Sequence, residues 1–213
     1  MIQTILFDLD ETLYPRGTGL MEQIRSLILD YIQTRLALSP QDADALRHQY
    51  LRTYGTTMRG LQIHHQIDAD EYLHFVHNIP LHEYLRPNLE LDAVLASIAQ
   101  DQVVFTNASR EHAEAVLMQL GVRRHFSRIV DIRDMNFESK PQPSAYRRIC
   151  DMLGVEPQAC MLVEDNIRNL RPAKALGMAT VLVDGDQADD SVDFSIKRIE
   201  DITTVLQDVN RKA

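Results

Sequence analysis

The sequence predicts an α/β fold in which a doubly wound parallel sheet carries an inserted helical domain. Short apolar runs bounded by turn residues recur at Ile2–Leu6, Val103–Thr106, Arg128–Val130, Met161–Val163 and Thr180–Val183. Helical patterns lie between the later runs, an alternation typical of parallel strands buried on both faces. About a hundred residues separate the first run from the second, too many for an ordinary strand-to-helix connection. They predict an insertion with its own structure.

Glycines mark the ends of the helices that alternate with the strands. Gly121, Gly154 and Gly177 each follow an apolar residue at the end of a helical pattern. A glycine is favoured there because it adopts the left-handed conformation that stops a helix. Strands alternating with such helices predict a doubly wound sheet.

The long insertion is predicted to be helical. Apolar residues follow helical spacing over Leu20–Ile32, Ser39 begins a second helix as its cap, and Asp68 opens a third that stops before Pro80. Pro87 marks the return to the sheet. The prediction therefore gives a core of residues 1–13 and 87–213 and a helical cap of residues 14–86.

Composition narrows the classes of partner. The 213 residues are 45% apolar and carry a net charge of −9, which disfavours nucleic acid as a partner. An anionic substrate therefore needs positive charge supplied locally. The two cysteines have no partners at metal-ligand spacing, and no apolar run reaches membrane-spanning length. We expect a soluble, cytoplasmic protein that does not associate with membranes.

Acidic residues follow the first predicted strand directly. Asp8 and Asp10 stand two residues apart at its carboxyl end, with Thr12 beyond them, and ligands bind at this edge of an α/β sheet. Asp8 suits a carboxylate nucleophile, and Asp10 suits general acid–base work. The alternative for this segment alone is a solvated turn.

Polar residues also stand at three later strand ends or helix starts. Thr106 and Asn107 follow the second apolar run, Lys140 precedes a proline-started helix, and Glu164 and Asp165 end a further run. Alone, the first pair is interpretable as a helix cap, the lysine as a surface residue and the acids as turn formers.

In this order, the four segments resemble the motifs of the haloacid dehalogenase superfamily. The resemblance covers nearly the whole chain and implies a Rossmann-like core with a helical cap. It implies that Asp8 is the nucleophile and Asp10 the acid–base residue. Phosphate would be bound by Thr106 and the Asn107 backbone, and its charge neutralised by Lys140.

The resemblance also implies a Mg²⁺ cofactor. Asp8, the Asp10 carbonyl and Asp165 are the expected oxygen ligands, with Glu164 as a further ligand or as an outer residue that orients them. Because halide leaves without a proton, Asp10 favours phosphoryl transfer over dehalogenation. A phosphatase is the preferred function, and a phosphomutase or a non-catalytic phosphometabolite-binding protein stays open.

Several segments are similar to a narrower group, the pyrimidine 5′-nucleotidase-like phosphatases. These segments are residues 10–15, 54–61, 84–88 and 105–110. The similarity implies a small phosphorylated metabolite as substrate, with the pyrimidine nucleotides UMP and CMP as candidates. Glu11 stands where this family often has a second aspartate, a change that leaves the chemistry intact.

Residues 54–60 of the cap are expected to face the site. Tyr54, Thr56, Thr57 and His64 are the candidate substrate contacts. A helix end at Gly55 is an equal alternative for the segment, and an exposed side chain is the preferred interpretation of the histidine. His74 and His77 share a helix face without acid or cysteine partners, so we interpret them as residues that bind no metal.

Overall fold

Six parallel strands form one sheet in the part of the chain that the computed structural model describes, residues 1–185 and 189–212. They lie in the order β3-β2-β1-β4-β5-β6. The strands are β1 (Thr4–Phe7), β2 (Asp101–Phe105), β3 (Arg128–Val130), β4 (Cys160–Glu164), β5 (Ala179–Val183) and β6 (Phe194–Ile196). The chain leaves β1 in one direction along the sheet and returns to its other side with β4, which places the topological switch point beside β1.

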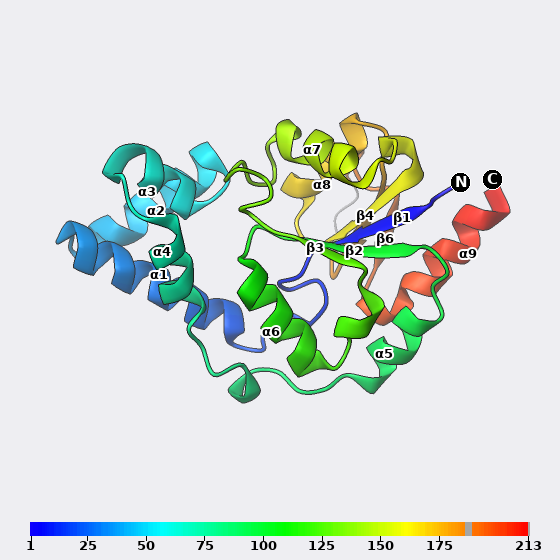
Figure 1. The fold of residues 1–213 in the computed structure, drawn as a ribbon, viewed down its shortest axis with the longest axis horizontal. Coiled ribbons are helices and arrows are strands. Elements are labelled where there is room, and N and C mark those ends of the chain that lie inside the picture. Colours follow the sequence, from blue (N-terminus) through cyan, green and yellow to red (C-terminus); the bar gives the residue numbers. More distant parts are fainter. Residues whose placement is uncertain (186–188, 213) are drawn as a thin grey trace.

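Helices cover both faces of this sheet (Figure 1). One face carries α5 (Leu89–Ala96), α6 (Arg110–Leu120) and α9 (Ile202–Lys212), and the other carries α7 (Pro143–Leu153) and α8 (Ile167–Ala175). Phe7 of β1 packs into the first layer and its neighbour Leu6 into the second. The predicted doubly wound α/β fold is confirmed.

The glycines at the helix ends behave as their positions predict. Gly121 and Gly154 are the left-handed C-caps of α6 and α7. Gly177 follows the C-cap of α8 with a positive φ of 89°. Single turns of 3₁₀ helix lie between the longer elements: η1 (Leu81–Glu83), η2 (Arg123–His125), η3 (Pro157–Ala159) and η4 (Ile199–Asp201).

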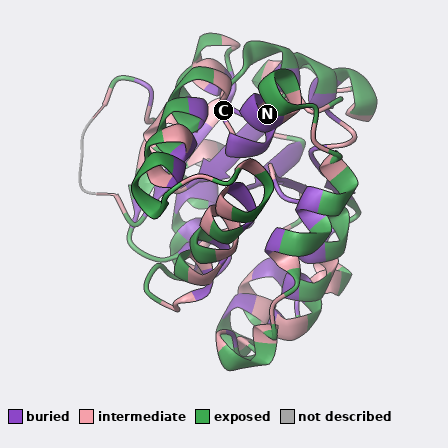
Figure 2. Cartoon of the chain, turned by 90° about the vertical axis from the view of Figure 1, so that its left-hand side faces the viewer, coloured by how far each residue is buried: buried purple, intermediate pink, exposed green. Residues whose placement is uncertain are grey.

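The insertion after β1 contains four helices, α1 (Leu20–Leu36), α2 (Pro40–Tyr54), α3 (Thr57–His65) and α4 (Ala69–His77). Buried residues of these helices form a third apolar cluster, which also includes Ile132 of the sheet domain. Leu20 and Ile24 of α1 pack instead with the first sheet layer. Figure 2 shows buried residues on the strands and on the facing sides of the helices. Helix α3 was not predicted from the sequence, although Thr56 caps its first turn by accepting from the Arg59 N–H.

Five polar contacts connect these helices to the sheet domain. Arg168 of α8 donates to the Leu51 and Arg52 carbonyls at the end of α2, and Ser139 donates to the Tyr54 carbonyl. The two others are an ion pair between Arg133 and Asp70 and a hydrogen bond between His77 and Ser109. In residues 1–185 and 189–212, every helix is too short or too polar to cross a bilayer.

Candidate active site

The carboxyl ends of β1, β2 and β4 bring the candidate site residues together. Asp8 follows β1, and its N–H donates to the Val163 carbonyl of the neighbouring β4 at 2.9 Å. Thr106 follows β2, and Glu164 is the last residue of β4. Because parallel strands end at the same edge of a sheet, these residues converge beside the switch point.

A buried lysine joins two of the carboxylates. Lys140 Nζ lies 2.7 Å from Asp8 Oδ1 and 2.9 Å from Glu164 Oε2. Its side chain is only 1% exposed and lies over the ring of Phe105. Burial alone would lower the pKa of Lys140, but the two carboxylates raise it overall. The ammonium therefore stays charged next to Asp8.

Asn107 fixes the backbone that carries this lysine. The Lys140 N–H donates to Asn107 Oδ1 at 2.9 Å, and Asn107 Nδ2 donates to the Lys140 carbonyl at 3.0 Å. The sequence suggested a phosphate contact through the Asn107 backbone and gave no signal of this clamp, since the partners are 33 residues apart. Only the fold brings them together.

Thr106 is buried at the start of the loop that leads into α6. Its Oγ1 accepts from the Ala108 N–H at 3.0 Å, which leaves the hydroxyl hydrogen available to donate. The turn ends at Ser109, the N-cap of α6. The Ala108 and His112 N–H groups already donate to Thr106 and Ser109, so an anion here would depend on the Thr106 hydroxyl and the Asn107 N–H.

Two residues that the sequence did not single out hold Asp10. Tyr14 OH donates to Asp10 Oδ1 at 2.7 Å, and His112 Nε2 lies 3.0 Å from the same oxygen. Burial would raise the pKa of Asp10, but the charge and hydrogen bonds of these neighbours lower it overall. Burial and the Asp10 carboxylate raise the pKa of Tyr14, so its hydroxyl remains a donor.

The acids beside Lys140 form a cluster with the geometry of a cation site. Ligand oxygens of Asp8, Glu164 and Asp165 all lie within 4.8 Å of one another. Burial, opposed by Lys140 and reinforced by the charge of Asp165, raises the pKa of Asp8 to about 6. An all-oxygen donor set short of positive charge fits a hard divalent cation such as Mg²⁺.

Arg16 lies at the exposed edge of this cluster. Its Nη2 is 2.5 Å from Asp165 Oδ2 and 2.9 Å from the Asp165 carbonyl, and its Nε is 3.7 Å from Glu11 Oε2. The guanidinium thus offsets part of the negative charge of Asp165. Because Arg16 leads into α1, this contact also links the helical insertion to the acids.

A cavity of about 310 Å³ lies between the insertion and the sheet domain. Asp10 and Asn107 line its inner end, and Thr56 and Thr57 line the cap side. Most of the remaining wall is apolar, from Met21, Ile24, Ile28, Leu51, Met58, Leu73 and Val76, with Arg25 and Arg47 as the basic residues. The cavity connects the predicted acid–base residue to the cap.

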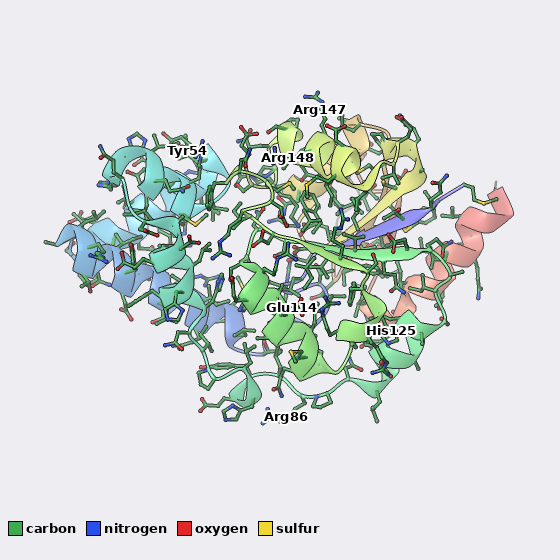
Figure 3. All side chains as sticks on the ribbon, viewed as in Figure 1. Tyr54, Arg86, Glu114, His125, Arg147 and Arg148 are labelled. Atoms are coloured by element: carbon green, nitrogen blue, oxygen red, sulfur yellow. The ribbon has the colours of Figure 1, made fainter. Side chains whose placement is uncertain are left out.

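The other two cap candidates lie outside the cavity wall. Tyr54 OH and His64 Nε2 are 2.6 Å apart and form a hydrogen bond with each other. Figure 3 labels Tyr54 on the helical insertion, where its ring packs with that of Tyr50. The neighbouring His65 bonds to the Tyr50 hydroxyl. The fold thus separates these side chains from Thr56 and Thr57.

A family model decides the relationship of this chain to known proteins. The model for haloacid dehalogenase-like hydrolases matches residues 2–177. The chain belongs to this family. The match includes strands β1 to β4 and the inserted helices, and it leaves the nucleotidase-like subgroup as a prediction.

Individual relatives are more distant. The Saccharomyces cerevisiae phosphate metabolism protein 8 is 26% identical over 195 residues, which cover 84% of this chain but 61% of the yeast protein. A phosphoglycolate phosphatase of Chromobacterium violaceum is 25% identical over 97% of both chains. The solved structure of a haloacid dehalogenase superfamily phosphatase from Thermococcus onnurineus matches with a TM-score of 0.66 at 18% identity, over 96% of this chain and 98% of that one. This structural likeness supports the fold.

Proposed function

We propose that the protein is a Mg²⁺-dependent phosphatase that hydrolyses a small phosphomonoester through an aspartyl-phosphate on Asp8. The observation that carries the proposal is the Asp8 carboxylate, which is buried, held at 2.7 Å by Lys140 Nζ and grouped with Glu164 and Asp165. A carboxylate in this setting is oriented, and positive charge stands where a phosphoryl group would arrive. The phosphatase names of relatives support the same reaction.

The reaction divides between two carboxylates. An Asp8 oxygen attacks phosphorus while the bond to the leaving oxygen breaks, and Asp10 gives that oxygen its proton. Asp10 then takes a proton from the water that attacks phosphorus, which releases phosphate and restores Asp8. Lys140, the Thr106 hydroxyl and the Asn107 N–H would stabilise the phosphoryl oxygens throughout.

Asp8, Asp165 and the Asp10 carbonyl would hold the Mg²⁺. When bound, the ion would neutralise phosphoryl charge and orient the group for in-line attack. Glu164 has another role in this proposal, because its oxygens accept from Lys140, Asn169 and the Asn166 N–H. It would position the lysine and contact the metal only indirectly.

The cavity supports a leaving group larger than that of a two-carbon phosphate ester. Its volume of about 310 Å³ is within the usual range for organic ligands, and its largely apolar wall suits a ring or a carbon chain. Thr56 and Thr57 offer hydroxyls to such a group, and Arg25 offers a cation. A pyrimidine nucleoside 5′-monophosphate is one substrate of this type.

A panel of phosphomonoesters assayed with and without Mg²⁺ tests this function. We expect free phosphate from several esters in the presence of Mg²⁺, with UMP or 1-naphthyl phosphate hydrolysed faster than phosphoglycolate. Transfer of phosphate to another position of the substrate would indicate a mutase instead. Ligand-induced stabilisation with no turnover of any ester would indicate a binding protein.

A further inference from the structure

His112 occupies a buried position between the predicted acid–base residue and the helical insertion. It is 3% exposed and lies in the first turn of α6. Its Nε2 and the Tyr14 hydroxyl both bind Oδ1 of Asp10. In the described part of the chain, these are the side chains that bond to the Asp10 carboxylate, and both use the same oxygen.

The partners of His112 determine which of its nitrogens carries a proton. The carboxylate of Asp10 can only accept, so Nε2 must donate. The other nitrogen, Nδ1, is buried and has no hydrogen-bond partner among the described residues. Nε2 is therefore the nitrogen that holds Asp10, and Nδ1 makes no competing contact.

Fixing Oδ1 determines where Asp10 can exchange a proton. Because Oδ1 already accepts two hydrogen bonds, a proton taken up by Asp10 belongs on Oδ2. Proton transfer to a leaving oxygen requires one oriented oxygen, and a freely rotating carboxyl group would present it only part of the time. The contacts of Oδ1 therefore make Oδ2 the reacting oxygen.

His77 connects this arrangement to the helical insertion. It is the last residue of α4, and its ring stacks on that of His112 with centroids 4.3 Å apart and planes 20° apart. Its Nδ1 lies 3.0 Å from the Ser109 hydroxyl, which itself accepts from the His112 N–H. Burial, together with the adjacent His112, lowers the pKa of His77 to about 3, so the stack forms without charge on His77.

We propose that His112 is a positioning residue that orients Asp10 for proton transfer. Because His77 of α4 stacks on His112, this orientation would depend on how α4 packs against the sheet domain. The inference rests on the proposed phosphatase function. It gives the cap a second task besides enclosing the leaving group, because correct placement of α4 would complete the acid–base group.

Leaving-group dependence provides the test. The value of kcat/KM reports steps up to departure of the leaving group. An alkyl phosphate such as β-glycerophosphate needs a proton for that departure, whereas the nitrophenolate of p-nitrophenyl phosphate leaves without one. In H112F, which keeps a ring but loses the donor, kcat/KM should fall roughly 30- to 100-fold for the alkyl ester and less than about threefold for the aryl ester. The alkyl KM should change little.

Three further variants complete the design. H112Q retains a donor and should recover part of the alkyl activity, and H77A should lose about three- to tenfold on the alkyl ester alone. The matched control is H125F, since His125 Nε2 binds Asp92 Oδ1 at 2.6 Å and lies on the side of the core away from α1 to α4 (Figure 3). The kcat/KM of H125F should equal that of the wild type for both substrates.

The two proposals fail in different ways. Equal losses on both esters in H112F and H112Q, or no loss on either, would overturn the positioning role while the phosphatase function stands. A wild-type protein that hydrolyses neither ester with Mg²⁺ would overturn both. The aryl activity of each variant also shows whether it has folded.

Discussion

Lys140 Nζ and Asp8 Oδ1 lie 2.7 Å apart in the interior, although 132 residues separate them in the chain. Lys140 Nζ also donates to Glu164 Oε2 at 2.9 Å. One positive charge is therefore shared between two buried carboxylates, and Asp165 lies next to them. The excess negative charge is the property from which the predictions for Lys140, Asp8 and Arg16 derive.

Lys140→Met should damage both stability and activity. Removing the ammonium leaves two buried acids without their counter-ion, a loss of about 3 kcal/mol or more in the free energy of unfolding. The value of kcat/KM for p-nitrophenyl phosphate should fall at least about 100-fold, because the phosphoryl charge loses its partner. Urea unfolding and steady-state kinetics measure the two effects.

A surface ion pair supplies the control for this lysine. Lys174 pairs with Asp193, and both side chains are partly exposed. Lys174→Met should cost no more than about 1 kcal/mol and leave turnover unchanged. Equal effects of the two substitutions would contradict a special role for Lys140.

Asp8→Asn should stabilise the protein while abolishing turnover. The folded pKa of Asp8, about 6, is above its ordinary 3.8, so this carboxyl favours folding less as pH rises from about 4 to 6. Asparagine has no such loss, and Glu164 still pairs with Lys140. At pH 7.5 without divalent cations, we expect about 1 kcal/mol of added stability, or about 2–4 °C in Tm.

The pH and metal dependence of this difference checks its cause. The gap in Tm between Asp8→Asn and wild type should shrink below pH 4, and it should shrink on adding Mg²⁺, which stabilises the wild type preferentially. Asp151→Asn, an exposed acid on α7, is the control and should shift Tm little. A lower Tm for Asp8→Asn at pH 7.5 would show that Asp8 is not under electrostatic strain.

The sheet was largely predictable because its strands are buried on both faces. Burial makes them continuous apolar runs, so β1 to β5 stand out in the sequence. The edge strand β6 (Phe194–Ile196) has three residues with mixed exposure and lacks that pattern. Helix α3 was missed because Gly55 and Thr56 favoured a turn, whereas they end α2 and cap the next helix.

Arg16→Gln should strengthen Mg²⁺ binding. The guanidinium contacts Asp165, one of the proposed ligands, and would compete with a cation there. Its side chain is 45% exposed, and an exposed ion pair contributes at most about 1 kcal/mol, so the apparent affinity should rise by no more than about fivefold. Titration of Mg²⁺ in the assay measures this change.

Arg147 on α7, labelled in Figure 3, provides the matched exposed arginine. Arg147→Gln should leave the Mg²⁺ dependence unchanged. Weaker Mg²⁺ binding in Arg16→Gln would mean that the arginine organises Asp165 for the ion and does not compete with it.

Gly55→Ala should disturb the contact between the insertion and the loop of Ser139 and Lys140. A Cβ there would lie 2.6 Å from Ser139 Oγ and 2.9 Å from the Lys140 carbonyl, and φ is +88°. We expect a stability loss of about 1–3 kcal/mol and a fall in kcat/KM of about tenfold or more. Kinetics with p-nitrophenyl phosphate and urea unfolding measure the two.

Gly121 separates the backbone effect from the clash. It has a similar φ of +79°, but a Cβ there meets nothing within 4 Å. Gly121→Ala should therefore cost about 1 kcal/mol in stability and leave kcat/KM intact. If both alanines preserve kcat/KM, Gly55 does not set the position of Lys140.

The candidate site was predictable only in part. Asp8, Asp10 and Lys140 belong to short motifs, but the partners that orient them come from distant segments. The His112 bond to Asp10 spans 102 residues, and the Asn107 clamp spans 33. Such contacts depend on which strands are adjacent in the sheet. Local sequence patterns predict the strands but not their order in the sheet.

Trapping the phosphoenzyme tests the central claim most directly. Asp10→Asn should slow attack by water, so that acid quenching during turnover of p-nitrophenyl phosphate with Mg²⁺ captures an acyl phosphate. Borohydride reduction then converts the modified aspartate to homoserine for mass spectrometry. The account predicts homoserine at position 8, absent from Asp8→Asn. Homoserine at another position, or sustained turnover in Asp8→Asn, would contradict it.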